Sequence, residues 1–209
     1  MKIAILVATI TLAATAPAGA TMIFDGSTLS RDASAFLGVN GGVFGRYTFS
    51  SATTISSFST LDALGSAANL SFRIYNSTTG ASLYTSAPKA FAADASATIA
   101  AGSFKKSDLF SFTFVPGTTY AAGAVSDNGN TLQIGSLSTK TEGGVSALLG
   151  NQNVTGGSFS TSTFCCSVAA QFFTGETGGV PEPMTWSLLV AGFAMVGIAA
   201  RRRSGVVAA

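Results

Sequence analysis

Two adjacent cysteines, Cys165 and Cys166, are the only cysteines in this chain of 209 residues, and they carry its most reactive side chains. In an oxidising compartment, neighbouring thiols can form a strained vicinal disulfide, pair with another molecule or act as a redox centre. If they lie on a strand, alternation turns one side chain inward and leaves the other as an exposed thiol. The sequence leaves these interpretations open.

The carboxylates are a second set of candidate chemical groups, but their spacing proposes no glycosidase pair. Between residues 21 and 180 they are scattered, at positions 25, 32, 62, 94, 108, 127, 142 and 176. We expect most of them to serve turns or caps, as Asp127 does at the start of the turn sequence DNGN. This turn offers oxygen ligands to calcium, yet it lacks the longer acidic loop of an EF-hand. The sequence predicts no metal site.

Histidine is absent from the chain, which excludes a Ser-His-Asp triad, histidine-ligated zinc and imidazole acid-base chemistry. Residues 21 to 180 hold seven Lys and Arg against eight Asp and Glu, a net charge of −1, so no nucleic-acid partner is expected. Because the only tryptophan, Trp186, lies near the C-terminus, ligand stacking would depend on tyrosines. Tyr75, on the polar side of its predicted strand, is the best candidate for a ligand platform. We predict a protein without enzymatic activity and without a cofactor.

The N-terminus has the composition of a secretory signal peptide. Lys2 precedes an apolar stretch that begins at Ile3, and Ala18 and Ala20 then fit the A-x-A cleavage rule. We expect the Sec machinery and signal peptidase to act on residues 1–20, so that the rest of the chain leaves the cytoplasm.

The C-terminus contains an uncharged apolar run, Met184 to Ala200, followed by Arg201, Arg202 and Arg203. At ~1.5 Å per residue this run reaches the short end of what spans a bilayer. Arginines after the span favour a cytoplasmic tail end, and Trp186 suits the membrane interface. The sequence predicts a single transmembrane helix at 184–200.

Immediately before this span lies Pro181-Glu182-Pro183, which must be extended rather than helical. Such a stiff segment with one carboxylate is one that a membrane-embedded peptidase could recognise. A linker rich in Gly and Thr, residues 174–180, separates it from the preceding domain.

The order of these features, Pro181-Glu182-Pro183, Trp186, the apolar span and then Arg201 to Arg203, resembles the PEP-CTERM sorting signal of the PEPxxWA type over residues 181–209. Some collections label the same tail an ice-binding protein C-terminal domain, which implies no ice binding here. Ser187 stands where that type usually has alanine, and six residues follow the arginines. The resemblance implies recognition by an exosortase, removal of the span and delivery of the protein to the cell surface or extracellular matrix.

The intervening residues 21–173 are rich in Gly, Ser, Thr and Ala and show short alternating runs, which predict an all-β domain. We predict one hairpin from 109–114 and 119–125 around Pro116-Gly117, and a second from NLSFRIYN and ASLYTS. Further strands are expected at 43–50, 53–59, 158–164 and 167–173. The strand pattern is weak in stretches 60–68 and 86–108. We expect 142–157 to be a surface loop with a short helix at 145–149.

The spacing of these strands favours an antiparallel β-sandwich. IYNSTTGASLY and FSFTFVPGTTYAAGA also resemble segments of jelly-roll sandwiches found before such tails, some of which bind carbohydrate. Three functions follow for the exported domain, in order of preference: a structural or biofilm-associated matrix protein, a module that binds exopolysaccharide, and a glycoside hydrolase. The membrane would then anchor the precursor transiently or permanently.

Overall fold

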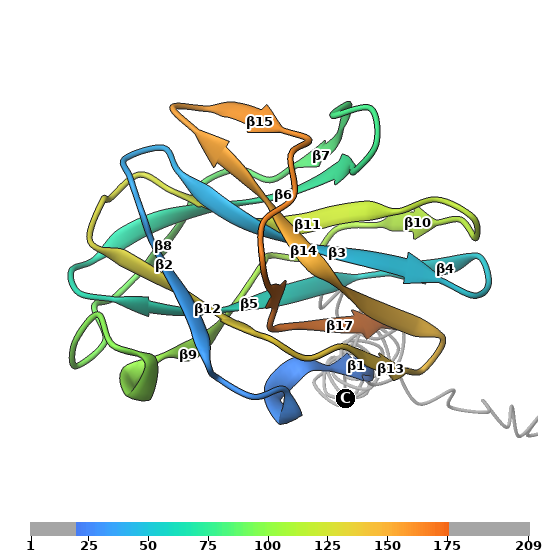
Figure 1. The fold of residues 1–209 in the computed structure, drawn as a ribbon, viewed down its shortest axis with the longest axis horizontal. Coiled ribbons are helices and arrows are strands. Elements are labelled where there is room, and N and C mark those ends of the chain that lie inside the picture. Colours follow the sequence, from blue (N-terminus) through green and yellow to red (C-terminus); the bar gives the residue numbers. More distant parts are fainter. Residues whose placement is uncertain (1–19, 176–209) are drawn as a thin grey trace, which may run out of the picture. The chain divides into compact units, whose positions relative to one another are not determined.

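The computed structural model describes residues 20–175, and this part of the chain is all-β, as the sequence predicts. Two large antiparallel sheets and one strand pair account for its strands (Figure 1). The only helical elements among the described residues are two short 3-10 turns, η1 (Gly26–Thr28) and η2 (Ile99–Ala101). No helix between residues 20 and 175 has the length and apolar character needed to cross a membrane.

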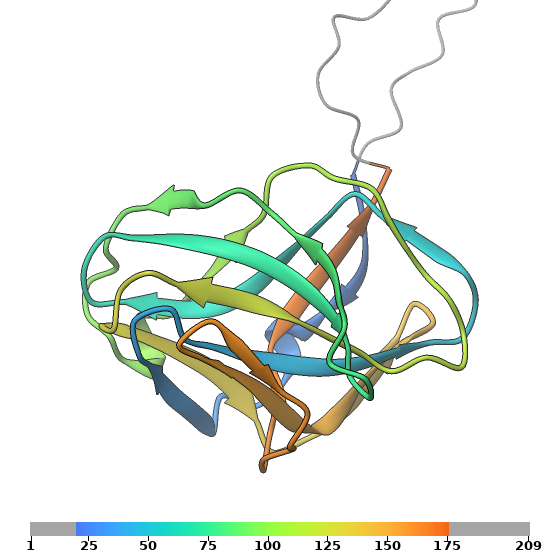
Figure 2. The same cartoon turned by 90° about the horizontal axis from the view of Figure 1, so that it is seen from above.

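The first large sheet has the order β1-β17-β5-β12-β16, with β2 also paired to β12 and β9 to β5. Its first and last described strands are neighbours, because Thr21 of β1 pairs with Thr174 of β17 (Figure 2). Its members are β1 (Thr21–Asp25), β2 (Ala33–Leu37), β5 (Ser57–Leu64), β9 (Ser103–Lys106), β12 (Thr131–Ser136), β16 (Ser167–Val168) and β17 (Ala170–Thr174).

The second large sheet has the order β13-β14-β3-β11-β6-β7, with β15 on β14 and β8 on β6. A separate pair joins β4 (Thr53–Ile55) to β10 (Phe112–Phe114). The second sheet consists of β3 (Gly42–Phe49), β6 (Ala68–Asn76), β7 (Ser82–Thr85), β8 (Lys89–Phe91), β11 (Tyr120–Ser126), β13 (Lys140–Glu142), β14 (Val145–Thr155) and β15 (Ser158–Ser160).

The main hydrophobic core takes side chains from both large sheets, an arrangement consistent with a β-sandwich. Phe172 of β17 is at its centre and makes ring contacts with five other aromatic side chains, those of Phe24, Tyr47, Phe49, Phe58 and Phe114. Fully buried aromatic rings dominate this interior, which explains why phenylalanine is so common in the chain.

The hairpin predicted from NLSFRIYN and ASLYTS is confirmed, because β6 pairs with β7. The hairpin predicted for 109–114 and 119–125 is wrong. Strand β10 pairs with β4, whereas β11 pairs with β3 and β6 in the other sheet. The turn at Pro116-Gly117 exists, with Gly117 at φ +79°, but it changes sheets instead of folding the chain onto itself.

The surface loop and short helix predicted within 142–157 are also wrong. This stretch contains β14, the longest strand described, which pairs with β3 along most of its length. Similarly, residues 60–64, expected to be weak, belong to β5, whose residues are all buried. A strand covered on both faces loses the alternating pattern on which the prediction depended.

The DNGN turn is confirmed in position, since the chain bends at 127–129 between β11 and β12. The carboxylate of Asp127 accepts hydrogen bonds from the backbone N–H and the side-chain amide of Asn69, at 2.8 and 2.7 Å. Asn128 Oδ1 accepts the N–H of Asn130 at 2.9 Å. Asp127 therefore ties the turn to the start of β6, which is a structural role.

Candidate functional site: a cavity beside a vicinal disulfide

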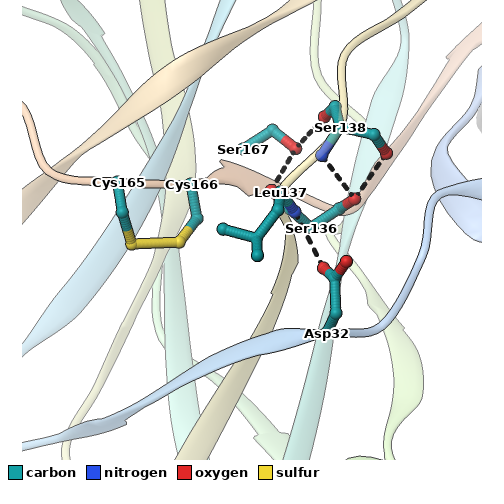
Figure 3. The surroundings of a disulfide bond; sticks show 7 residues. All are labelled: Asp32, Ser136, Leu137, Ser138, Cys165, Cys166 and Ser167. Carbon is teal, nitrogen blue, oxygen red and sulfur yellow. Dashed lines mark hydrogen bonds between the residues drawn. A yellow bond between two sulfur atoms is a disulfide. The ribbon is translucent and has the colours of Figure 1, made fainter.

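Cys165 and Cys166 are joined to each other by a disulfide in the segment between β15 and β16 (Figure 3). The side chain of Cys165 is exposed and that of Cys166 is buried. The N–H of Phe164 donates to the carbonyl of Asn151 at 2.9 Å. On the other side, Ser167 Oγ donates to the carbonyls of Ser136 and Ser138, at 3.0 and 2.8 Å. Both flanks of the disulfide are thus fixed to neighbouring strands.

The disulfide borders a cavity of about 190 Å³, which we call the disulfide cavity. Strands β2, β12 and β16 of the first sheet and β3 and β14 of the second all contribute to its walls, so it lies where the two sheets meet. Its lining consists of Ala33, Ser34, Ala35, Val43, Gln133, Ile134, Gly135, Asn151, Asn153, Phe164, Cys165, Cys166, Ser167 and Val168.

Three amide side chains in this lining have a buried polar atom without a hydrogen-bond partner: Gln133 Nε2, Asn151 Oδ1 and Asn153 Oδ1. Gln133 is 2% exposed, and its other amide atom, Oε1, accepts the N–H of Val43 at 2.9 Å. Buried polar atoms almost always have partners, because leaving one unpaired costs about 1–3 kcal/mol. Three of the five such atoms in the described residues belong to the lining of this one cavity, which makes it the candidate binding site.

The local structure of β14 explains why two asparagines reach the same cavity. Asn151 and Asn153 are two residues apart and so share one face of the strand. Gln152, between them, points to the other face, where Nε2 donates to the carbonyls of Ser77 and Thr161, both at 2.8 Å. The register of β14 against β3 shifts between Leu148 and Gln152, and such irregularities re-aim side chains.

A second cavity of about 130 Å³ adjoins the first and shares Ala35, Val43 and Asn153 with it. Its further lining comes from the end of β2, the following turn and the end of β14. Phe36, with 66% of its surface exposed, is its aromatic residue, and Phe164, with 52% exposed, is that of the disulfide cavity. We call this second space the Phe36 cavity.

Neither lining contains an Asp, Glu, Lys or Arg residue. The two cavities therefore offer amide, hydroxyl and backbone groups together with apolar surface, and no group for proton transfer at neutral pH. Their chemistry suits the binding of an uncharged polar molecule.

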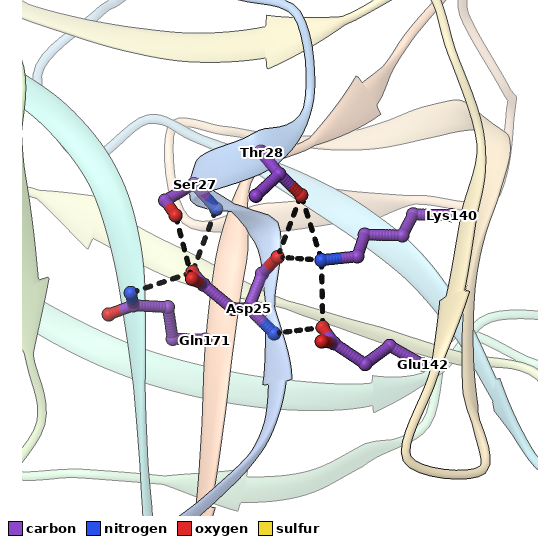
Figure 4. Close-up of polar contacts among 6 residues, drawn as sticks. All are labelled: Asp25, Ser27, Thr28, Lys140, Glu142 and Gln171. Carbon is purple, nitrogen blue, oxygen red and sulfur yellow. Dashed lines mark hydrogen bonds and ion pairs between the residues drawn. The ribbon is translucent and has the colours of Figure 1, made fainter.

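The carboxylates near the N-terminal strand serve structure (Figure 4). Glu142 Oε2 accepts the Asp25 N–H at 2.8 Å and pairs with Lys140 Nζ at 2.7 Å. The hydrogen bond from Lys140, followed by that from the Asp25 backbone, lowers the pKa of Glu142. Partial burial would raise the pKa of Asp25, but hydrogen bonds from Gln171 and Ser27 outweigh it and lower that pKa. This network links β1, β13 and β17.

A second carboxylate pair, Asp62 and Asp94, has pKa values shifted in opposite directions. Complete burial raises the pKa of Asp62 to about 6, against the effect of a hydrogen bond from Thr60. Burial also acts to raise the pKa of Asp94, but hydrogen bonds from the Leu64 backbone and from Lys105 outweigh it and lower that pKa.

Opposite shifts are typical of an acid and base pair. However, the contacts of Asp94 are structural, since it accepts the Leu64 N–H at 2.7 Å and Lys105 Nζ at 2.8 Å. Neither carboxylate lines the disulfide cavity or the Phe36 cavity. Between residues 20 and 175, no group of three or more Cys, Asp or Glu side chains gathers to hold a metal ion.

Tyr75, the predicted ligand platform, is 5% exposed and belongs to a small buried cluster with Phe44. Its ring is stacked against Phe159, with centroids 4.1 Å apart. Phe159, on β15, therefore covers a ring face that a ligand would need. Among the predicted cleavage and sorting-signal residues, the structure describes Ala20, which is an exposed residue before β1. The others, Ala18, Pro181, Glu182, Pro183, Trp186, Arg201, Arg202 and Arg203, lie outside the described residues.

Gln133, Asn151, Asn153, Phe36 and Phe164 were not singled out by the sequence. Their spacing carries no motif, because the cavities form only when β2, β12 and β14 come together through pairings distant in sequence. The one local signal is the Asn-Gln-Asn run at 151–153, which places two amides on one face once a strand is assumed. Comparison with family models, with curated proteins and with solved structures found no match to this chain.

Proposed function

We propose that the chain is an exported protein of the cell surface or extracellular matrix, in which a non-catalytic, jelly-roll-like β-sandwich has a structural or biofilm-associated role. The observation that carries the proposal is the ordered C-terminal series of Pro181-Glu182-Pro183, Trp186, apolar span and arginines. The N-terminal signal sequence supports the same direction of transport. Two antiparallel sheets around one aromatic core support a sandwich.

In this proposal the Sec machinery exports the precursor, signal peptidase cuts near Ala20, and the span at 184–200 holds the protein in the membrane. An exosortase then recognises Pro181-Glu182-Pro183 and removes the span. The carboxylate of Glu182 is the specificity element, since proline supplies shape but no charge.

The test is the Glu182→Ala variant expressed in the producing bacterium. We expect full-length precursor to accumulate in the membrane, because the peptidase loses the only charge in its motif. The conservative variant Glu182→Asp is the matched control and should retain part of the processing. Intact-protein mass of surface and membrane fractions measures both, and processing of Glu182→Ala at the parent rate would refute the sorting function.

The second candidate function is an exopolysaccharide-binding module, and a specific observation favours it. Three unpaired amide atoms and two exposed phenylalanines line adjoining uncharged cavities. Such a combination of apolar surface with a few polar groups is typical of ligand sites. Retention of the protein on immobilised exopolysaccharides tests this function, and free passage over every polymer would contradict it.

A glycoside hydrolase is the least favoured alternative. It needs two carboxylates separated by about 5 to 10 Å across a sugar. The two cavities present none, and the Asp62 and Asp94 oxygens already accept hydrogen bonds from neighbouring groups.

A further inference from the structure

We propose that the disulfide cavity and the Phe36 cavity together form one cleft for a neutral saccharide, with one sugar ring in each cavity. The inference rests on the carbohydrate-binding function above and deepens it by assigning the atoms that bind, the charge of the ligand and the number of rings.

Hydrogen bonding in the cleft matches hydroxyl groups. Gln133 Nε2 is a donor, whereas Asn151 Oδ1 and Asn153 Oδ1 are acceptors, and each is buried and unpaired. A hydroxyl donates one hydrogen bond and accepts others, so neighbouring hydroxyls on one sugar ring can satisfy both kinds of group. A purely apolar ligand would leave all three atoms unpaired.

The apolar part of the cleft matches the C–H face of a sugar. Phe164 and the Cys165–Cys166 disulfide border the first cavity, and Phe36 with the exposed Val39 borders the second. Because the two cysteines are adjacent and bonded, they form a small ring with few internal rotations, which presents a fixed, uncharged wall. Aromatic side chains that remain exposed on a monomer gain free energy by covering such a face.

Charge and size narrow the ligand further. Neither lining has an ionisable side chain, so a carboxylate or sulfate on the sugar would lose water without gaining an oppositely charged partner. The two volumes, about 190 and 130 Å³, are below the ~300–1,000 Å³ of sites for drug-sized ligands. Each space therefore suits a single ring, and their shared wall at Asn153 makes the two rings consecutive units of one chain.

The experiment measures saccharide affinity by saturation-transfer NMR with the full chain, held in a detergent that has no sugar headgroup. Probes are glucose, mannose and N-acetylglucosamine, the β-linked disaccharide of each, and glucuronic acid as the charged counterpart of glucose. We expect at least one neutral sugar to bind, its disaccharide to bind roughly tenfold more tightly, and glucuronic acid to give no signal.

Variants then assign the cavities. Phe164→Ala and Asn153→Leu should weaken both monosaccharide and disaccharide by roughly tenfold, the equivalent of about 1.4 kcal/mol. Phe36→Ala should weaken the disaccharide alone, because only the second ring reaches that cavity. Leu109→Ala is the matched control, as it removes an exposed apolar side chain outside both linings and should change neither affinity.

Several outcomes would overturn the cleft. These are no signal from any sugar, an affinity in Phe164→Ala and Asn153→Leu equal to that of the parent protein, or displacement of the sugar by an extended Gly-Ser hexapeptide, which would indicate a peptide ligand instead. Polymer retention that survives both variants would leave the binding function standing and place it elsewhere on the molecule. Conversely, sugar binding that depends on Phe164, without retention on any polymer, would support the cleft and contradict the exopolysaccharide-binding function.

Discussion

The interior between the two sheets differs from the disulfide cavity in whether its polar atoms have hydrogen-bond partners and its aromatic rings are covered. In the interior, Phe172 is enclosed by five aromatic rings, and no side chain of that core has an unpaired buried polar atom. In the disulfide cavity, amide atoms lack partners and Phe164 is half exposed. The first region contains packed groups without an unpaired polar atom, whereas the second contains buried amide atoms that no protein group satisfies.

The largest expected effect is in the interior. Phe172→Ala should lower the free energy of unfolding by about 3–5 kcal/mol, since it empties a fully buried site among packed rings. Phe164→Ala is the matched control, and it should change stability by no more than about 0.5 kcal/mol. Urea denaturation followed by circular dichroism measures both. Similar losses in the two variants would remove the distinction between the regions.

An intermediate effect is expected at Asp62, a buried carboxylate on β5 whose charged form lowers the stability of the fold. Its pKa is about 6 in the fold and 3.8 in the reference state, because burial disfavours the charged form. The folded protein therefore binds the proton more tightly, and this residue's contribution to stability falls as pH rises from about 4 to 6.

Asp62→Asn abolishes that titration, so the variant should gain about 2–3 kcal/mol relative to the parent between pH 4 and pH 7. Carboxylates with lowered pKa values, such as Asp94 and Glu142, stabilise the fold more as pH rises. Because variant and parent both contain them, their contributions to stability cancel in the comparison. Urea denaturation at the two pH values is the measurement. If the difference in stability between variant and parent does not change with pH, the pKa of Asp62 is not raised in the folded protein.

The two regions also differ in how far the sequence predicts them. The alternation of Phe110, Phe112 and Phe114 predicts that they face a core, and all three pack into or against the main core. Their strand partner could not be predicted, since the local turn at Pro116-Gly117 suggested β11 while the actual partner, β4, is distant in sequence.

The site was harder to predict because its residues obey no local period. Val145 and Ala147 alternate inward along β14, but a register shift and Gly150 at φ +87° interrupt the pattern before Asn151. An Ala-Leu-Leu run there favours a helix, and pairing with β3 overrides that weak preference. The positions of the cysteines relative to Gln133 depend on the same long-range pairing.

The smallest expected effect is the change in stability of Asn153→Leu, and it separates the interior from the disulfide cavity most directly. Removing a buried acceptor that has no partner should leave the free energy of unfolding unchanged or raise it by up to about 1 kcal/mol, because no hydrogen bond is lost and apolar area is gained. The matched control is Asn69→Leu, which gives up a 2.7 Å hydrogen bond to Asp127 and should lose about 0.5–1.5 kcal/mol. Urea denaturation decides the sign. If Asn153→Leu weakens saccharide binding without lowering the free energy of unfolding, Asn153 serves the ligand and not the fold. A loss of stability equal to that of Asn69→Leu would instead make Asn153 part of the structural framework.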